Sequence, residues 1–223
     1  MSSRRLPGKA LRPIAGRPML TRVIERCAAS RRASGVIVAT SDRAEDDPLI
    51  ALAREAGAAT FRGDLEDVAG RALACAQAGG YAAFVRISGD SPFMDPDLID
   101  RAIATHEAER PDLTTNTHPR GFPPGMSVEV ISTASLRAAL ADTTEPDDRE
   151  HVTPYFYRNA VRLRIVNLTP ERSYPAGLRL TVDDAEELKR ADGIARRLSE
   201  PYALAPAARI IELAAGLATE AVR

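Results

Sequence analysis

Apolar residues recur along this chain with two spacings, one typical of amphipathic helices and the other of buried strands. Between Pro18 and Ser30 they return every three or four residues, which predicts a helix. Short apolar runs at 35–40 and 81–88 predict strands instead. Because the two kinds of element alternate, we expect one α/β domain over residues 1–223, with a mostly parallel (mixed) sheet flanked by helices.

The same spacings predict the remaining elements. Further helices are expected at 48–56, 67–78, 96–109, 133–141, 185–198 and 207–217. Further strands are expected at 58–62, 128–131, 162–168 and 178–182. The segment 110–126 contains four prolines and two glycines, which predicts a loop, either at an interface or ligand site or as an ordinary surface connection.

Composition and charge exclude several classes of protein. The 223 residues carry a net charge of −1, so no overall field attracts nucleic acid or an anionic membrane. No apolar run reaches the length of a membrane span and no signal-peptide pattern is present, so we expect a cytoplasmic protein. Cys27 and Cys75 lie in alanine-rich segments and are interpreted as small buried residues. The two cysteines and three histidines have no zinc-ligand spacing.

The start of the chain combines cations with a glycine turn. Arg4, Arg5 and Lys9 lie close together, and Gly8 directly precedes the lysine. Only two of the 30 basic residues are lysines, so a lysine in this turn favours a need for a compact charge suited to phosphate. The alternative is a solvated surface lysine. The segment is not a Walker A loop, because Ala10 stands where that motif has a serine or threonine.

Carboxylates come at or just after the ends of three predicted strands. They are Asp42, Asp90 and Asp183, and Asp90 lies in a Gly-Asp-x-Pro turn. Ligands of α/β sheets bind at the carboxyl ends of the strands. Two carboxylates that face a cationic loop suit Mg²⁺, which is held by one or two carboxylates together with substrate phosphates. We therefore expect Asp90 and Asp183 to bind Mg²⁺, whereas Asp42 is either a ligand or a helix cap.

Two other acidic residues precede predicted helices. Asp184 comes before the helix at 185, and Asp95 comes before Pro96, a pattern typical of helix N-caps. Asp95-Pro96-Asp97 also matches the D-x-D metal motif of glycosyltransferases. We expect Asp95 to be a cap and keep the metal motif as the alternative.

Six short segments, in order over most of the chain, together resemble one family. These segments are Met1–Leu11, Val36–Asp42, Phe61–Val68, Arg86–Pro92, Arg149–Tyr155 and Leu178–Asp183. Each is weak alone, but the ordered set resembles the cytidylyltransferases of the spore-coat polysaccharide biosynthesis protein F type. That group is related to the acylneuraminate and 3-deoxy-manno-octulosonate cytidylyltransferases. The resemblance implies the nucleotide-diphospho-sugar transferase fold, which is GT-A-like or Rossmann-like.

The resemblance also implies a reaction, its partners and its residues. CMP would be transferred from CTP to a sugar or sugar acid with release of pyrophosphate, for surface polysaccharide or glycan biosynthesis, by a homodimer that uses Mg²⁺. The implied catalytic residues are Arg5, Lys9 and Asp90. The implied nucleotide-binding residues are Ser3, Arg4, Arg5, Lys9, Thr40, Asp42, Arg62, Arg71 and Arg86. The implied acceptor-binding residues are Glu129 and His151, and the implied metal ligands are Asp90 and Asp183.

The chain departs from the family pattern in two places. Pro124 and Ser127 stand where the family carries acidic residues near the acceptor, which implies an acceptor with fewer hydroxyls or amines to bind there. The family's first strand, which lies in the middle of its sheet, has no counterpart. We therefore expect an N-terminally truncated domain whose true start lies upstream, since buried backbone groups without partners cost about 1–3 kcal/mol each.

Two other functions stay open at this point. A GT-A-type glycosyltransferase that consumes a nucleotide sugar would use Asp95 and Asp97 as metal ligands. An inactive truncated relative would keep the family pattern without binding CTP. The position of the carboxylates relative to Lys9 distinguishes the first alternative, and CTP binding distinguishes the second.

Overall fold

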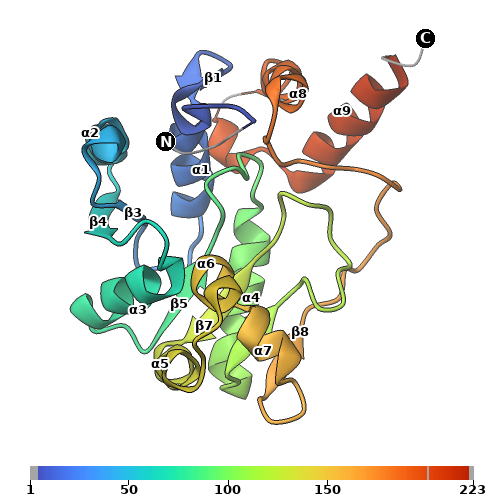
Figure 1. Cartoon of the computed structure of the whole chain (residues 1–223). Coiled ribbons are helices and arrows are strands. Elements are labelled where there is room, and N and C mark those ends of the chain that lie inside the picture. Colours follow the sequence, from blue (N-terminus) through green and yellow to red (C-terminus); the bar gives the residue numbers. More distant parts are fainter. Residues whose placement is uncertain (1–4, 200, 221–223) are drawn as a thin grey trace.

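Helices and strands alternate along the chain much as the apolar spacing predicts (Figure 1). The structure is a computed structural model that describes residues 5–199 and 201–220. Its α-helices are α1 (Met19–Ala28), α2 (Asp47–Glu55), α3 (Val68–Ala78), α4 (Pro96–Glu109), α5 (Thr133–Asp142), α6 (Pro146–His151), α7 (Pro154–Arg158), α8 (Ala185–Ala195) and α9 (Ala207–Glu220). None of these helices is long and apolar enough to cross a membrane.

The strands form three separate groups within the described part of the chain. They are β1 (Pro13–Ile14), β2 (Arg17–Pro18), β3 (Ile37–Ser41), β4 (Ala59–Gly63), β5 (Ala83–Arg86), β6 (Leu113–Thr115), β7 (Glu129–Ser132) and β8 (Ile165–Asn167). β1 and β2 form an antiparallel pair, and β3 and β4 form a parallel pair. The third group is a four-stranded sheet in the order β5-β7-β6-β8, in which β7 runs antiparallel to both neighbours and β6 runs parallel to β8. The predicted α/β class with a mixed sheet is therefore confirmed.

The structure contains β1, β2, α6 and α7, which the sequence analysis did not predict, and it differs from the prediction in two further segments. β6 lies inside the segment 110–126, which was expected to be a loop throughout. The strand expected at 178–182 joins no ladder in the described residues, although the segment is extended. Its backbone is held by other partners, because the amide of Leu180 donates to the carbonyl of Pro124 at 2.8 Å and that of Val182 donates to Asp90 at 3.0 Å. Leu180 and Val182 are buried, which explains the apolar pattern without a strand.

Apolar side chains cover both faces of the four-stranded sheet. On one face Met94, Ile99 and Val130 belong to a large core that reaches Ile194 of α8. On the other face Leu113, Ile131, Leu136 and Phe156 form a second core under α5 and α7. Val130 and Ile131 are adjacent in β7 and are both almost fully buried, as expected for a central strand.

The edges of β3 and β5 have one ladder partner each in the described ranges. β3 pairs with β4, and β5 pairs with β7. Helices bridge the interval between the two pairs, because α1 packs against both α2 and α4, while α3 packs against β3 and β4 as well as α5 and α6. Figure 1 shows the α2–β3–β4 unit to the left of α1. All four residues of β5 are only half-buried, so β5 is less covered than β7.

Candidate active site

Lys9 contacts two carboxylates that are distant from it in the sequence. Gly8, with a φ of 67°, turns the chain into the short 3₁₀ helix η1 (Lys9–Leu11). The Nζ atom of Lys9 lies 3.1 Å from an Asp90 carboxylate oxygen and 2.9 Å from an Asp183 carboxylate oxygen. Arg5 adds a second cation, 3.1 Å from the other oxygen of Asp183. These four residues are called the Lys9 cluster below.

Each carboxylate of the Lys9 cluster is held by its backbone. Asp90 follows β5, and its carbonyl accepts from the amide of Val182. The Val182 carbonyl in turn accepts from Lys9 Nζ at 3.1 Å. The backbone amide of Asp183 donates to Glu187 in the first turn of α8 at 2.7 Å. Asp184 caps that helix, as predicted, by accepting from the Glu187 amide.

The segment that carries Asp183 is also fixed by a close backbone approach. Gly125 has a φ of 95°, and a Cβ atom at this position would lie 2.5 Å from the carbonyl carbon of Leu180. The Leu180 amide donates to the carbonyl of the preceding Pro124. Gly125 therefore allows the loop between β6 and β7 to lie directly against residues 180–183.

Charge and burial act in opposite directions within the Lys9 cluster. Burial alone would raise the pKa of Asp183, but Lys9 and Arg5 hold that pKa below its ordinary value. Burial would likewise lower the pKa of Lys9, but Asp183 and Asp90 more than offset it, so the Lys9 pKa is raised. The side chains of Lys9, Asp90 and Asp183 are each about one-fifth exposed. The cluster is thus charged and accessible to a ligand.

The residues of this cluster fit a magnesium ion that is bound partly by the protein and partly by a substrate. Asp90 and Asp183 come from separate segments and converge on one cation. Among the described residues, no group of three or more His, Cys, Asp or Glu side chains could hold a metal ion. Mg²⁺ is commonly bound by one or two carboxylates plus substrate phosphates, so two carboxylates suffice.

Most of the other predicted nucleotide-binding residues lie around the ends of β3 and β4. Arg62 donates to the Ser41 carbonyl at 3.1 Å and to the Asp47 carboxylate at 2.6 Å. Thr40 is buried and donates to the Asp46 carboxylate at 2.8 Å. These two side chains hold the segment that follows β3, and no contact joins them to the Lys9 cluster among the described interactions.

Arg71 and Asp42 also belong to this region, whereas two predicted residues cannot be placed. The guanidinium group of Arg71 donates to the carbonyl of Asp64. Asp42 is exposed, and its side chain caps neither η2 (Ala44–Asp46) nor α2, so the cap interpretation of Asp42 is wrong. Ser3 and Arg4 lie outside the described residues.

Glu129 lies in a second, more deeply buried cluster. Its carboxylate accepts from Arg86 Nη1 at 2.5 Å, Tyr157 OH at 2.7 Å and Thr153 Oγ1 at 2.8 Å. Arg86 and Glu129 are opposite residues in the β5–β7 ladder, which brings them together. These four residues are called the Glu129 cluster. Arg86, expected on the nucleotide side, is thus paired with a residue expected on the acceptor side.

His151 is not part of the Glu129 cluster. Its ring is exposed and lies 3.6 Å from Asp147, one turn earlier on α6. Thr153 and Tyr157 reach Glu129 instead, and neither was singled out from the sequence. Their spacing of four residues was the available signal, because such residues lie on the same side of a helical segment.

The alternative metal motif Asp95-Pro96-Asp97 has a structural role. Asp95 caps α4 by accepting from the Asp97 amide at 3.2 Å, as predicted. The Asp97 carboxylate pairs with Arg31 at 3.0 Å. Asp90 and Asp183, rather than this pair, contact Lys9. The arrangement required for the glycosyltransferase alternative is therefore absent from the described residues.

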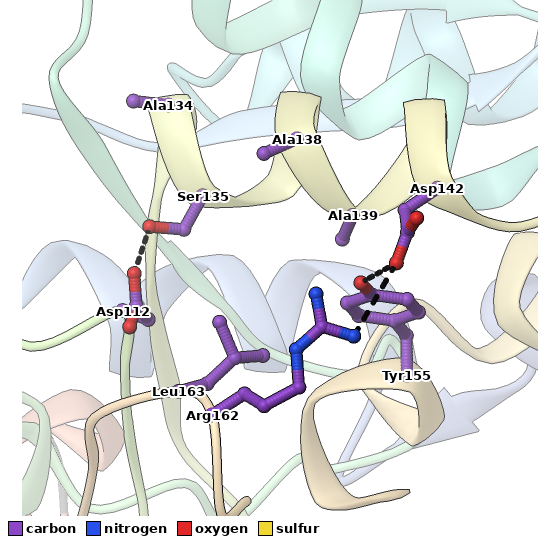
Figure 2. Close-up of a pocket in the computed structure, with 9 residues that line it drawn as sticks. All are labelled: Asp112, Ala134, Ser135, Ala138, Ala139, Asp142, Tyr155, Arg162 and Leu163. Atoms are coloured by element: carbon purple, nitrogen blue, oxygen red, sulfur yellow. Dashed lines mark hydrogen bonds and ion pairs between the residues drawn. The ribbon is translucent and has the colours of Figure 1, made fainter. Parts of the chain in front are cut away.

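A surface cavity of about 450 Å³ lies at the start of β6, the end away from Glu129 (Figure 2). Its polar side chains are paired with one another. Ser135 donates to Asp112 at 2.5 Å, and Tyr155 donates to Asp142 at 2.5 Å. Asp112 precedes β6, whereas the Glu129 cluster lies beside Thr115 at the end of that strand. The cavity is thus separate from both clusters.

The fold and the Lys9 cluster are compatible with a nucleotidyltransferase, and comparison with known proteins shows that the chain is one. The chain belongs to the cytidylyltransferase family, whose sequence model matches residues 1–198. It is 31% identical over 207 residues to the spore coat polysaccharide biosynthesis protein SpsF of Bacillus subtilis, covering 90% of this chain and 85% of that protein. It is 31% identical over 188 residues to an uncharacterised protein of Methanocaldococcus jannaschii, covering 84% and 76%.

Solved structures agree with this assignment. A cytidylyltransferase from Leptospira borgpetersenii superposes with a TM-score of 0.90 at 27% identity, covering 98% of this chain and 92% of that one. A CMP:2-keto-3-deoxy-manno-octonic acid synthetase complexed with CTP has a TM-score of 0.68 at 18% identity, covering 88% and 95%, which shows a shared fold. The resemblance and the fold predicted from the sequence are confirmed, and the protein is a nucleotidyltransferase enzyme.

Proposed function

We propose that this enzyme transfers CMP from CTP to a sugar acid and releases pyrophosphate. The observation that supports the proposal is the convergence of Lys9 on Asp90 and Asp183, which brings a cation suited to phosphate beside two carboxylates suited to a metal ion. Several relatives support the acceptor class. One is a 3-deoxy-manno-octulosonate cytidylyltransferase of Geobacter sulfurreducens, 40% identical over 119 residues that cover 52% of this chain and 45% of that protein.

In the proposed reaction an acceptor hydroxyl attacks the α-phosphorus of CTP. The new phosphorus–oxygen bond forms as the bond to the β-phosphate bridging oxygen breaks, and the hydroxyl proton passes to solvent. Asp90 and Asp183 would hold Mg²⁺, which when bound neutralises charge on the triphosphate. Lys9 and Arg5 supply positive charge to the β- and γ-phosphates and to the pyrophosphate that leaves. Catalysis of this kind depends on positioning and charge rather than on a covalent intermediate.

Pyrophosphate release tests this reaction. The assay contains CTP, Mg²⁺ and either 3-deoxy-manno-octulosonate or an acylneuraminate, with the neutral sugar mannose as a comparison. We expect release with a sugar acid and its loss in Asp90→Ala. Glu107→Ala is the matched control, because Glu107 is exposed on α4 and pairs with Arg32. Full activity of the Asp90→Ala variant would refute the role of Asp90.

We further propose that the active domain contains one more parallel strand, between β3 and β5. The support is that α1 and α3 pack across the interval between the β3–β4 pair and the four-stranded sheet, while β3 and β5 each have a single ladder partner in the described residues. The test compares CTP binding by residues 1–223 with binding by the same chain extended at its N-terminus by an apolar strand. Tighter binding by the extended chain is expected, and equal binding would contradict the proposal. A chain that binds CTP only when extended would be the inactive truncated relative.

The same family likeness leads us to propose a cytoplasmic homodimer. Light scattering on the purified protein tests the assembly, with an expected mass of twice the 24.0 kDa of one chain. A mass of one chain at micromolar concentration would contradict it.

A further inference from the structure

The loop between β6 and β7 carries two exposed basic side chains, His118 and Arg120. The imidazole ring of His118 stacks on the ring of Tyr157, with centroids 4.6 Å apart and an interplanar angle of 20°. Arg120 Nη1 donates to the Ser127 hydroxyl at 2.9 Å. No aspartate or glutamate occurs between residues 116 and 128. The loop therefore exposes donors and positive charge without a carboxylate of its own.

Neighbouring side chains hold this surface in a fixed position. Asn167, the last residue of β8, accepts from the His118 amide at 3.1 Å and donates to the Pro119 carbonyl at 3.1 Å. The Tyr157 hydroxyl contacts Thr117 Oγ1 at 2.9 Å and donates to Glu129 at 2.7 Å. Both rings of the stack are thus anchored. A surface that is already ordered loses little conformational freedom when a ligand binds, which favours affinity.

The loop lies at the edge of the sheet where the Lys9 cluster lies. Thr115, at the start of the loop, pairs with Glu129 in the β6–β7 ladder, and Glu129 pairs with Arg86 at the end of β5. Asp90 comes four residues after Arg86, a span of at most about 14 Å of extended chain. Pro124 of the same loop accepts from the Leu180 amide in the segment that leads to Asp183. The loop is thus tied at one end to the ladder that leads to Asp90 and at Pro124 to the segment that carries Asp183.

We propose that His118 and Arg120 bind the carboxylate of the acceptor and select sugar acids over neutral sugars. This inference rests on the proposed CMP transfer. A guanidinium group pairs with a carboxylate through two parallel hydrogen bonds, and an imidazole N–H donates a third. The Tyr157 ring packs against one face of the His118 ring. Glu129 does not oppose such a ligand, because it is buried and paired with Arg86.

The departures from the family pattern agree with this assignment. Pro124 and Ser127 stand in this loop where the family carries acidic residues, and Ser127 is the residue that Arg120 contacts. An acidic side chain at 127 would pair with Arg120 more strongly than the serine does. A serine leaves most of the guanidinium group available.

Two variants with a matched control test the assignment by kinetics. His118→Ala and Arg120→Ala are expected to raise KM for 3-deoxy-manno-octulosonate about 10- to 100-fold, the effect of losing a charged hydrogen bond. KM for CTP should stay within about twofold, because neither side chain belongs to the Lys9 cluster. Arg209→Ala is the control, since Arg209 is an exposed arginine on α9 with one carboxylate partner, Glu212. A rise in the KM of CTP instead of that of the acid would overturn the assignment.

A binding measurement separates this inference from the proposed reaction. The imidazole resonances of His118 are followed by NMR while 3-deoxy-manno-octulosonate is added to the protein with CTP and without divalent cation, so that no turnover occurs. A saturable shift with the acid and none with mannose supports the inference, even if no pyrophosphate is released in the kinetic assay. Absence of a shift with the acid, or an equal shift with mannose, overturns it. The Arg120→Ala variant should weaken the acid titration about tenfold or more.

Discussion

The Lys9 cluster and the Glu129 cluster both join carboxylates to cations near the end of β5, but their surroundings differ. The Lys9 side chain is about one-fifth exposed and is shared between Asp90 and Asp183. The Glu129 side chain is 6% exposed and accepts three hydrogen bonds from fixed neighbours. Partial exposure leaves the first cluster open to a ligand, as the proposed binding of a metal ion by the carboxylates and of phosphate by Lys9 requires. The second cannot bind a ligand through Glu129 without first losing an internal partner.

Because of this difference in exposure, ion pairs of the same chemical type should contribute differently to activity and to stability in the two clusters. An accessible ion pair contributes about 0–1 kcal/mol to folding, because water can replace either partner. Breaking a buried pair leaves an uncompensated charge and destabilises by about 3–5 kcal/mol. Substitutions in the Lys9 cluster should thus lower activity far more than stability, whereas substitutions of Glu129 should do the reverse.

The largest expected effect is that of Lys9→Met on activity. Loss of the ammonium group should lower kcat/KM for CTP about 10²- to 10³-fold, the usual effect of removing one electrostatic contact to a reacting group. The free energy of unfolding should fall by about 1–2 kcal/mol, because the pairs are partly exposed and Asp90 and Asp183 lose their shared cation. Steady-state kinetics and urea unfolding measure the two quantities. Lys189→Met is the matched control, because Lys189 is the other lysine of the chain and is exposed on α8.

The same Lys9→Met variant has a second expected property. Without its ammonium group, Asp90 and Asp183 lose the cation that they share, so Mn²⁺ should bind more tightly in the absence of nucleotide, by about fivefold. The electron paramagnetic resonance signal of free Mn²⁺ measures this affinity. Weaker Mn²⁺ binding in Lys9→Met than in Lys189→Met would contradict the role of the two carboxylates as metal ligands.

Glu129→Gln should have the opposite effect to Lys9→Met, lowering stability more than activity. The change leaves Arg86 without its counter-charge, so we expect a loss of about 3 kcal/mol in unfolding free energy, at the low end for buried pairs because Arg86 is one-third exposed. Urea unfolding measures the loss, and a double change with Arg86→Met should recover part of it. An unchanged unfolding free energy in Glu129→Gln would mean that the two clusters do not differ as their burial indicates.

Gly125→Ala tests the contact between the β6–β7 loop and the segment that carries Asp183. Its positive φ and the 2.5 Å approach of a Cβ atom to the Leu180 carbonyl carbon both oppose any side chain. We expect a loss of about 1–3 kcal/mol in thermal or urea unfolding, together with weaker CTP binding because Asp183 follows the displaced segment. Gly16→Ala is the control, since it also has a positive φ but nothing within 4 Å of its Cβ position. Equal effects of the two changes would assign the loss to backbone strain alone.

The apolar spacing was sufficient to predict elements in which it extends over several turns. Helix α4 begins and ends where its apolar spacing and its Asp95–Pro96 cap predict. β6 has only three residues, in a proline-rich segment, and its stability comes from β7 and β8 on either side. The opposite error arose at 178–182, where burial of alternate residues gave a strand pattern although the backbone bonds to a loop.

The candidate site was predictable in part for the same reason. Asp90 and Asp183 could be predicted to lie at one edge of the sheet because both follow apolar runs, and the structure brings both to Lys9. The pairing of Arg86 with Glu129 depends on the antiparallel register of β5 and β7, which no local pattern reveals. Arg26 is an extreme case, since its fully buried side chain donates to the carbonyls of residues 94, 202, 203 and 205, which only the tertiary fold brings together.

The smallest expected effect concerns the pH dependence of the Lys9 cluster. Lys9 and Arg5 hold the pKa of Asp183 below its ordinary value near 4, so the folded protein keeps this carboxylate charged where the unfolded chain does not. The resulting stability, about 1 kcal/mol, is complete above about pH 5 and disappears as the pH falls through 4 toward the lowered pKa. In Lys9→Met the Asp183 pKa should rise, which an NMR titration of its carboxyl carbon measures. An unchanged Asp183 pKa in Lys9→Met would mean that Arg5 alone lowers this pKa. Lys9 would then contribute nothing to the charge state of Asp183.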